Sequence, residues 1–153
     1  IHLAGAEIEL VSQVAREHRL RTAIATYLES AEEFVHFVLI DCPPSLGLLT
    51  INAFAAADEV FIPIQCEYYA LEGLSQLLGS IGMIQKHLNP ALHVSTILLT
   101  MYDGRTRLAQ QVADEVRTHF TDQVLNTVIP RSVRVSEAVI FWRLAEMAPR
   151  QSR

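Results

Sequence analysis

Short apolar runs alternate with longer amphipathic segments along the 153 residues, and this alternation most narrows the folds open to the chain. It predicts βα units around a mostly parallel sheet. The runs expected to be strands are residues 35–40, 59–64, 94–100 and 124–129. The segments expected to be helical are 4–32 in two pieces, 46–57, 71–88 and 106–120, with two short helices at 132–138 and 139–148. In such a sheet, ligands bind outside the carboxyl ends of the strands, so the loops at 41–45, 65–69, 100–105 and 130–137 are where a site is expected.

Charge is spread unevenly along the chain. The formal net charge is -5, and 50% of the residues are hydrophobic, which excludes a disordered chain and a wholly basic nucleic-acid binder. Residues 105–153 nevertheless carry eight arginines and five acids, whereas residues 1–104 carry four basic and twelve acidic side chains. A basic end on an acidic body allows local contact with an anion.

Features of membrane, secreted and metal-binding proteins are missing from the printed sequence. No apolar stretch approaches the roughly 20 residues that cross a bilayer, and residue 1 onward does not read as a signal peptide, so we expect a cytoplasmic protein. Cys42 and Cys66 lack a CxxC spacing, and the six histidines lack the helical pairing of a zinc site. We expect both cysteines to behave as small buried hydrophobes.

An acidic residue stands directly after the first predicted strand. Asp41 follows Phe37, Val38, Leu39 and Ile40, which is the Walker B arrangement that places a carboxylate beside nucleotide-bound Mg²⁺, although an acid that merely caps a strand has the same pattern. Pro43 and Pro44 stiffen the loop. Ser45 either caps the next helix, which we favour, or supplies a hydroxyl to the site.

Four long blocks in order carry a resemblance to a known family. They are FVLIDCPPSLGLLTINA (37–53), IPIQCEYYALEGLSQLL (62–78), ILLTMYDGRTRLAQQV (97–112) and VIPRSVRVSEA (128–138), and LAGAEIELV (3–11) fits the same family. Together they resemble the ParA family of Walker-type chromosome and plasmid partitioning ATPases. The resemblance covers about residues 1–138, which we interpret as a partial ATPase domain, and leaves 139–153 as a divergent tail that we expect to be helical.

The resemblance implies a three-layer fold of the P-loop NTPase type and an ATP-dependent switch. Members of the family bind ATP and Mg²⁺, form a homodimer with nucleotide at its interface, and bind DNA without sequence preference. A ParB-like centromere-binding protein stimulates hydrolysis. The implied location is the cytoplasm, on the nucleoid.

The resemblance also implies roles for individual residues. Asp41 is expected to hold Mg²⁺ through water, in a switch loop with Pro43, Pro44 and Ser45. The expected nucleotide-side residues are Thr100, Met101, Pro130 and Arg131, and the expected DNA-facing residues are Arg117, Arg131 and Arg134, with Arg105 and Arg107 as further candidates. Arginine forks match phosphate oxygens, while a merely solvated helix face is the alternative for each arginine.

The sequence departs from the family at its phosphate-binding loop. The printed residues contain no GxxxxGK[ST] motif, and Lys86 is the only lysine. Without that loop and lysine, most of the electrostatic stabilisation of phosphoryl transfer is missing, so we expect this chain alone to be inactive and to bind ATP poorly. We expect the missing P-loop strand to lie N-terminal to Ile1 in relatives, which would leave a sheet edge open.

Two further alternatives concern function. The chain could be a non-catalytic module, derived from a ParA protein, that binds DNA or a partner. A MinD-like membrane-positioning role is disfavoured by the EYYALEG and VIPRSVRVSEA blocks.

Within EYYALEG, Glu67, Tyr68 and Tyr69 could contact a partner across a dimer, but we favour packing against the following helix.

Overall fold

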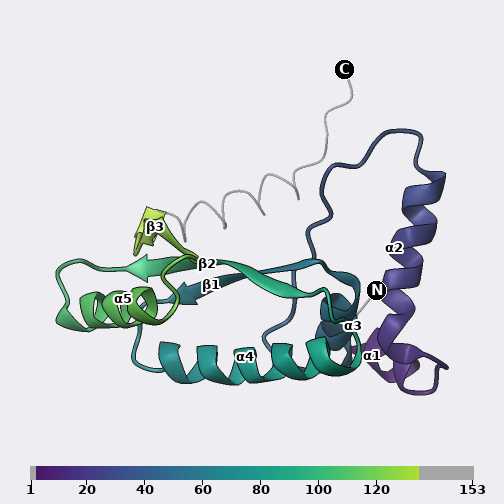
Figure 1. Cartoon of the computed structure of the whole chain (residues 1–153), viewed down its shortest axis with the longest axis horizontal. Helices are drawn as coiled ribbons and strands as arrows, with labels where there is room; N and C mark the ends of the chain where they lie inside the picture. Colours follow the sequence, from purple (N-terminus) through teal and green to yellow (C-terminus); the bar gives the residue numbers. More distant parts are fainter. Residues whose placement is uncertain (1–2, 135–153) are drawn as a thin grey trace. The chain divides into compact units, whose positions relative to one another are not determined.

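A computed structural model describes residues 3–134 of the chain. Its helices are α1 (Leu3–Val11), the 3-10 helix η1 (Arg16–His18), α2 (Arg19–Ser30), α3 (Leu48–Ala56), α4 (Ala70–His87) and α5 (Arg107–His119), and its strands are β1 (Glu59–Gln65), β2 (His93–Tyr102) and β3 (Val124–Pro130) (Figure 1). The chain divides into two compact units, which are described separately. The described part of unit 1 comprises residues 3–62 with 71–96, and that of unit 2 comprises 63–70 with 97–134.

Unit 1 is organised around α3, which contacts α1, η1 and α2. Small alanine side chains allow this close approach, and Ala53 and Ala55 are buried. Asn52 is only 2% exposed, and its amide fastens α3 to the preceding helices: Nδ2 donates to the carbonyl oxygens of Arg16 (2.8 Å) and Leu48 (2.9 Å), and Oδ1 accepts from the backbone N–H of Leu20 (3.1 Å). A buried polar side chain is thus fully used for hydrogen bonding.

Both ends of α3 are also secured from distant parts of unit 1. At its start, the backbone N–H of Leu48 donates to Oε1 of Glu7 at 2.9 Å. At its end, buried Asn89 donates from Nδ2 to the carbonyl oxygens of Phe54 (3.0 Å) and Ala57 (2.7 Å). These side chains satisfy groups that a helix end leaves without an intrahelical partner.

The three strands form one sheet in the order β1-β2-β3. β2 and β3 are parallel, with Ile97 opposite Val124 and Leu99 opposite Val128. Ile97 and Leu99 are fully buried, and β1 alternates buried and exposed residues along its length. In unit 2, α5 buries one face made of Ala109, Val112, Ala113 and Val116. The predicted α/β fold with a parallel sheet is confirmed.

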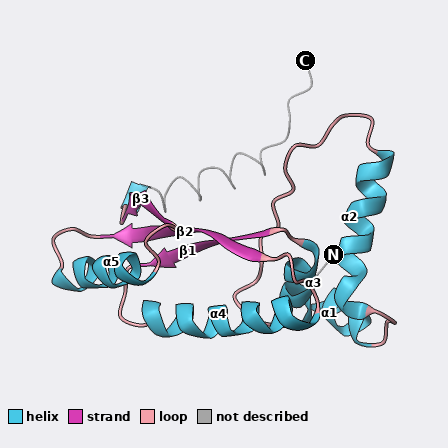
Figure 2. Ribbon diagram, in the orientation of Figure 1, coloured by secondary structure: helices cyan, strands magenta, loops and turns pink. Residues whose placement is uncertain are grey.

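The predicted strand at 35–40 is wrong. These residues lie in the long loop between α2 and α3, which contains neither helix nor strand (Figure 2). Phe37 is 85% exposed and Leu39 is 94% exposed. A β-strand needs a neighbour for its backbone hydrogen bonds, and within residues 3–134 the sheet consists of β1, β2 and β3 alone.

The predicted helix cap at Ser45 is also wrong. Ser45 does not cap α3, because the residue at the cap position is Gly47 and the side chain that meets the first N–H is that of Glu7. The short helices predicted at 132–138 and 139–148, and the tail 139–153, fall wholly or mostly outside the described residues.

Over the described part of the chain, the structure contains no helix that is both long and apolar enough to span a bilayer.

Candidate functional site at the strand ends

The carboxyl ends of the three strands bring several predicted site residues together in unit 2. We call Glu67, Thr100–Asp103, Pro130 and Arg131 the strand-end edge. Thr100 fastens β2 to β1 here. Its Oγ1 donates to the carbonyl oxygen of Ile64 at 3.1 Å, and its own carbonyl oxygen accepts from the backbone N–H of Cys66 at 3.0 Å.

Met101 has an unusual backbone at this edge. Its φ of 52° lies in the left-handed region, which costs a residue other than glycine about 1–2 kcal/mol. The carbonyl oxygen of Thr100 accepts from the β1 side, whereas that of Tyr102 accepts from the backbone N–H of Arg131 at 3.0 Å. The carbonyl group of Thr100 is therefore directed toward Cys66, and the carbonyl group of Tyr102 is directed toward Arg131. The left-handed backbone of Met101 accounts for this change of direction.

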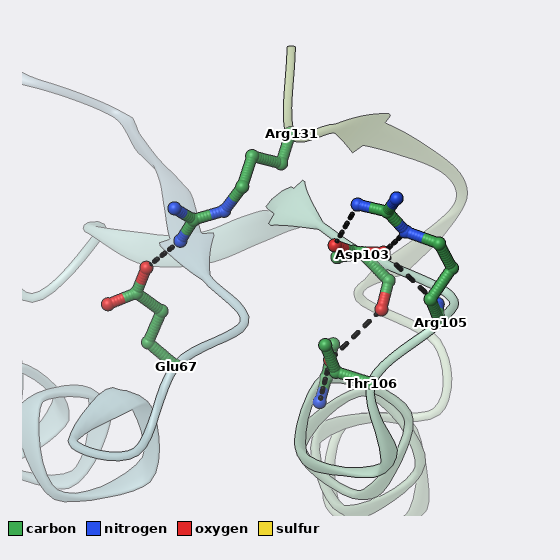
Figure 3. Close-up of polar contacts among 6 residues, drawn as sticks. Glu67, Asp103, Arg105, Thr106 and Arg131 are labelled. Carbon is green, nitrogen blue, oxygen red and sulfur yellow. Dashed lines mark hydrogen bonds and ion pairs between the residues drawn. The ribbon is translucent and has the colours of Figure 1, made fainter. Parts of the chain in front are cut away.

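The turn after β2 is fixed by Asp103 and Arg105. The carboxylate of Asp103 accepts from the backbone N–H of Arg105 (3.1 Å), from its Nε (2.9 Å) and from a terminal guanidinium nitrogen (2.8 Å) (Figure 3). These hydrogen bonds from Arg105 stabilise the ionised form and lower the pKa of Asp103 to about 2. The carbonyl oxygen of Asp103 also accepts from Thr106, whose Oγ1 in turn caps α5 by accepting from the backbone N–H of Ala109 at 3.3 Å.

A second ion pair crosses the edge. A terminal guanidinium nitrogen of Arg131, at the end of β3, donates to Oε1 of Glu67, just beyond β1, and Figure 3 shows the two side chains directed toward each other. About half of each side chain is exposed to solvent. An exposed pair of this kind contributes about 0–1 kcal/mol to stability.

Cys66 lies buried at the same edge, as expected from the sequence. Burial raises the pKa of its thiol, and the positive charge of Arg117, in the last turn of α5, partly opposes that rise. Arg117 is thus near enough for its field to act at the end of β1. Within residues 3–134, neither Arg117 nor Arg134 takes part in a hydrogen bond or an ion pair with another side chain.

Asp41, Pro43, Pro44 and Ser45 lie in the loop between α2 and α3, which belongs to unit 1. Asp41 is exposed. The pKa of neighbouring Cys42 is raised, first by burial and then by the negative charge of Asp41. No group of three or more histidine, cysteine, aspartate or glutamate side chains within residues 3–134 is arranged to hold a metal ion.

The sequence missed three features of the strand-end edge. Tyr68 and Tyr69, expected to pack, are 75% and 73% exposed and pair edge to face with each other, so that prediction is wrong. The Glu67–Arg131 pair joins residues 64 apart, which no local pattern reveals. Nothing in the sequence indicates the positive φ of Met101 either, because glycine is the residue that usually marks such a position.

Comparison with known proteins identifies similar chains. A family model described as an AAA domain matches residues 1–94. The sporulation initiation inhibitor protein Soj of Bacillus subtilis is 59% identical over 138 residues, which cover 90% of this chain and 53% of the relative. The chromosome partitioning protein ParA of Myxococcus xanthus is 55% identical over 141 residues, covering 92% of this chain and 48% of the relative.

A solved structure is also similar. Cobyrinic acid a,c-diamide synthase from Mycobacterium smegmatis, crystallised with bound ADP and magnesium, superposes with a TM-score of 0.72 at 38% identity, over 94% of this chain and 57% of that one. The chain spans about half the length of the relatives it matches.

Proposed function

Because the chain belongs to the ParA family, we propose that it forms part of a chromosome- or plasmid-partitioning ATPase, an ATP-dependent switch that binds DNA without sequence preference. The names of the relatives support the partitioning role. In this proposal the whole protein works as a homodimer on the nucleoid, and a ParB-like centromere-binding protein stimulates its hydrolysis of ATP.

The observation that best supports a nucleotide-side role is the hydrogen bond from the backbone N–H of Arg131 to the carbonyl oxygen of Tyr102. It joins the ends of β2 and β3, so that Thr100 and Met101 share one edge with Pro130 and Arg131. Ligands of open parallel sheets bind at such an edge. We assign these four residues to the adenine side of the nucleotide in the whole protein.

The phosphate side does not fit ATP and Mg²⁺ in this chain. Its only lysine, Lys86, lies in α4, and the sequence contains no glycine loop whose backbone N–H groups could cradle phosphates. Asp41 is the carboxylate that we assign to Mg²⁺ through water, with Pro43, Pro44 and Ser45 as the switch loop. One exposed carboxylate does not by itself make a metal site.

The proposed DNA contacts are Arg117, Arg131 and Arg134. All three belong to the arginine-rich part of the chain, and guanidinium groups match phosphate oxygens in geometry and charge. Binding through phosphates is independent of base sequence and falls steeply with added salt. The expected affinity is therefore similar for duplexes of different sequence and lower at higher ionic strength.

The alternative is a non-catalytic module that binds DNA or a partner, and the absence of a P-loop sequence from the 153 residues favours it for this chain taken alone. A thermal melt with and without Mg²⁺ and ATP tests whether this chain alone binds nucleotide. A ligand at 100 times its dissociation constant stabilises the folded state by roughly 2.7 kcal/mol. We expect no shift for this chain; a clear upward shift would show that it binds nucleotide without the phosphate loop.

DNA binding provides the second test. Fluorescence anisotropy with a labelled duplex, repeated over a range of salt concentrations, should show binding that weakens as salt is added. Binding that is unaffected by ATP favours the non-catalytic module. Failure to bind DNA at low salt would contradict the DNA-binding part of the proposal.

A further inference from the structure

Two arginines near the strand-end edge are already occupied by carboxylates of the same unit. Arg105 is bound by Asp103, and Arg131 is bound by Glu67 (Figure 3). Of the three arginines assigned to DNA, Arg131 is the one with an acidic partner within the described residues. The Glu67–Arg131 pair therefore bears directly on how that arginine can meet a phosphate.

The backbone on each side of this pair is fixed. The backbone N–H of Glu67 donates to the carbonyl oxygen of Gln65 (2.8 Å), and the carbonyl oxygen of Glu67 accepts from the backbone N–H of Ala70 (3.0 Å). The backbone N–H of Arg131 is bound to Tyr102. Only the two side chains need to move for the pair to open, and about half of each is already in solvent.

A carboxylate and a phosphate compete for the same guanidinium N–H donors. We propose that Glu67 masks Arg131 in the free protein and is displaced by a DNA phosphate, so that Glu67 limits the affinity for DNA. This inference rests on the proposed DNA-binding function. Exposed ion pairs are weak, so the masking lowers the affinity by about two- to fivefold and does not abolish binding.

The pair contributes little to the fold, which suits a competing role. Neither side chain is buried, and the adjacent Tyr68 and Tyr69 are exposed as well, so the removal of the Glu67 charge leaves no buried group unpaired. Glu67→Gln preserves the size of the side chain and should leave the thermal melt of the 153-residue chain unchanged within about 2 °C.

The test compares four forms of the 153-residue chain with the wild type by anisotropy with a labelled duplex at several salt concentrations. They are Glu67→Gln, the control Asp114→Asn, Arg131→Ala, and the double variant Glu67→Gln with Arg131→Ala. Asp114 is exposed on α5 in the same unit and forms no ion pair within residues 3–134, so its variant removes one negative charge without freeing an arginine. Glu67→Gln should bind two- to fivefold more tightly than Asp114→Asn, with a similar salt slope, because Arg131 contacts the phosphate in both complexes once Glu67 is displaced.

The double variant distinguishes the hypothesis that Glu67 masks Arg131 from the hypothesis that Arg131 contacts DNA. Arg131→Ala in the Glu67→Gln background should abolish the gain and flatten the slope by about one. If Arg131→Ala weakens binding in that background but Glu67→Gln binds no better than Asp114→Asn, masking is wrong and the DNA role of Arg131 stands. If Arg131→Ala has no effect even in that background, the DNA role of Arg131 is wrong, and masking falls with it.

Discussion

Arg131 and Tyr102 are joined through their backbones, with the N–H of Arg131 donating to the carbonyl oxygen of Tyr102 at 3.0 Å, one residue beyond the left-handed Met101. This bond and the Thr100–Cys66 bond direct the carbonyl groups on either side of Met101 toward different neighbours. The local conformation of Met101 is therefore imposed by its neighbours at a cost in backbone energy.

The first prediction tests that cost. Glycine adopts a positive φ without the steric cost that a side chain brings, but it also increases the entropy of the unfolded state. The free energy of unfolding of Met101→Gly should therefore stay within about 1 kcal/mol of wild type. Met101→Val should lose more, about 2 kcal/mol, because a β-branched residue tolerates positive φ poorly.

Leu98, in the middle of β2 without a positive φ, provides the control for this pair. There glycine should be the more destabilising replacement and valine the milder one. Urea denaturation of all four variants measures the order. The same order at both positions would contradict the strain at Met101.

The second prediction concerns pH. The pKa of Asp103 is lowered to about 2 from its ordinary value of 3.8 by the hydrogen bonds from Arg105. Because the folded-state pKa lies below the unfolded one, the ionised carboxylate stabilises the fold above about pH 4, and this contribution is lost as the pH falls toward 2. Asp103→Asn should therefore be less stable than wild type at pH 7 and approach it between pH 4 and 2.

Arg105→Gln serves as the control for the titration, since it keeps the carboxylate and removes the guanidinium. The pKa of Asp103 should rise toward its ordinary value in this variant, as measured by NMR of the side-chain carboxyl carbon. An unchanged low value would show that Arg105 is not its cause.

The third prediction concerns Glu7 and Gly47 at the start of α3. Gly47 has a φ of -78°, which any residue can adopt, but a Cβ built there would collide with Oε1 of Glu7. Gly47→Ala should displace the carboxylate from the N–H of Leu48 and destabilise the chain by about 1 kcal/mol, as the loss of a helix cap does.

The two positions should be strongly coupled. In a Glu7→Ala background, Gly47→Ala should cost nothing or become slightly stabilising, because the collision is gone and the unfolded chain is less flexible. A double-mutant cycle by chemical denaturation measures this. Additive losses would show that Glu7 does not occupy the start of the helix.

The fourth prediction concerns Asn52. Asn52→Ala leaves the part-buried backbone groups of Arg16, Leu20 and Leu48 without that partner and should cost about 2 kcal/mol. Asn126→Ala, at an exposed position of β3, should change stability by no more than about 0.5 kcal/mol. Equal losses in the two denaturation curves would contradict the anchoring role of Asn52.

The sequence correctly predicted the helices and strands whose type follows from the periodicity of their own residues. The alternation of Val60, Ile62 and Ile64 and the helical period of Val112 and Val116 match burial in the structure. Residues 35–40 have an equally clear strand pattern, yet they form no strand, because a strand depends on a partner that its own sequence does not specify.

The candidate site was predictable only in outline. The parallel-sheet rule places Thr100, Met101, Pro130 and Arg131 at one edge, as the structure does. The rule cannot indicate which acidic side chain forms an ion pair with a given arginine. The Glu67–Arg131 and Asp103–Arg105 pairs depend on loop conformations, which tertiary contacts determine. The assignments of Asp41 and of the DNA-facing arginines stay predictions.

The buried carboxamides of Asn52 and Asn89 hold the middle and the end of α3, and they differ in kind from the ion pairs of the strand-end edge. An amide carries no net charge and is shielded here from the solution, so ionic strength and acidity leave its hydrogen bonds nearly untouched. The exposed guanidinium–carboxylate contacts weaken as mobile ions crowd around them. Raising the salt should therefore loosen the side chains of one unit while the helical cluster of the other keeps its protection against hydrogen exchange.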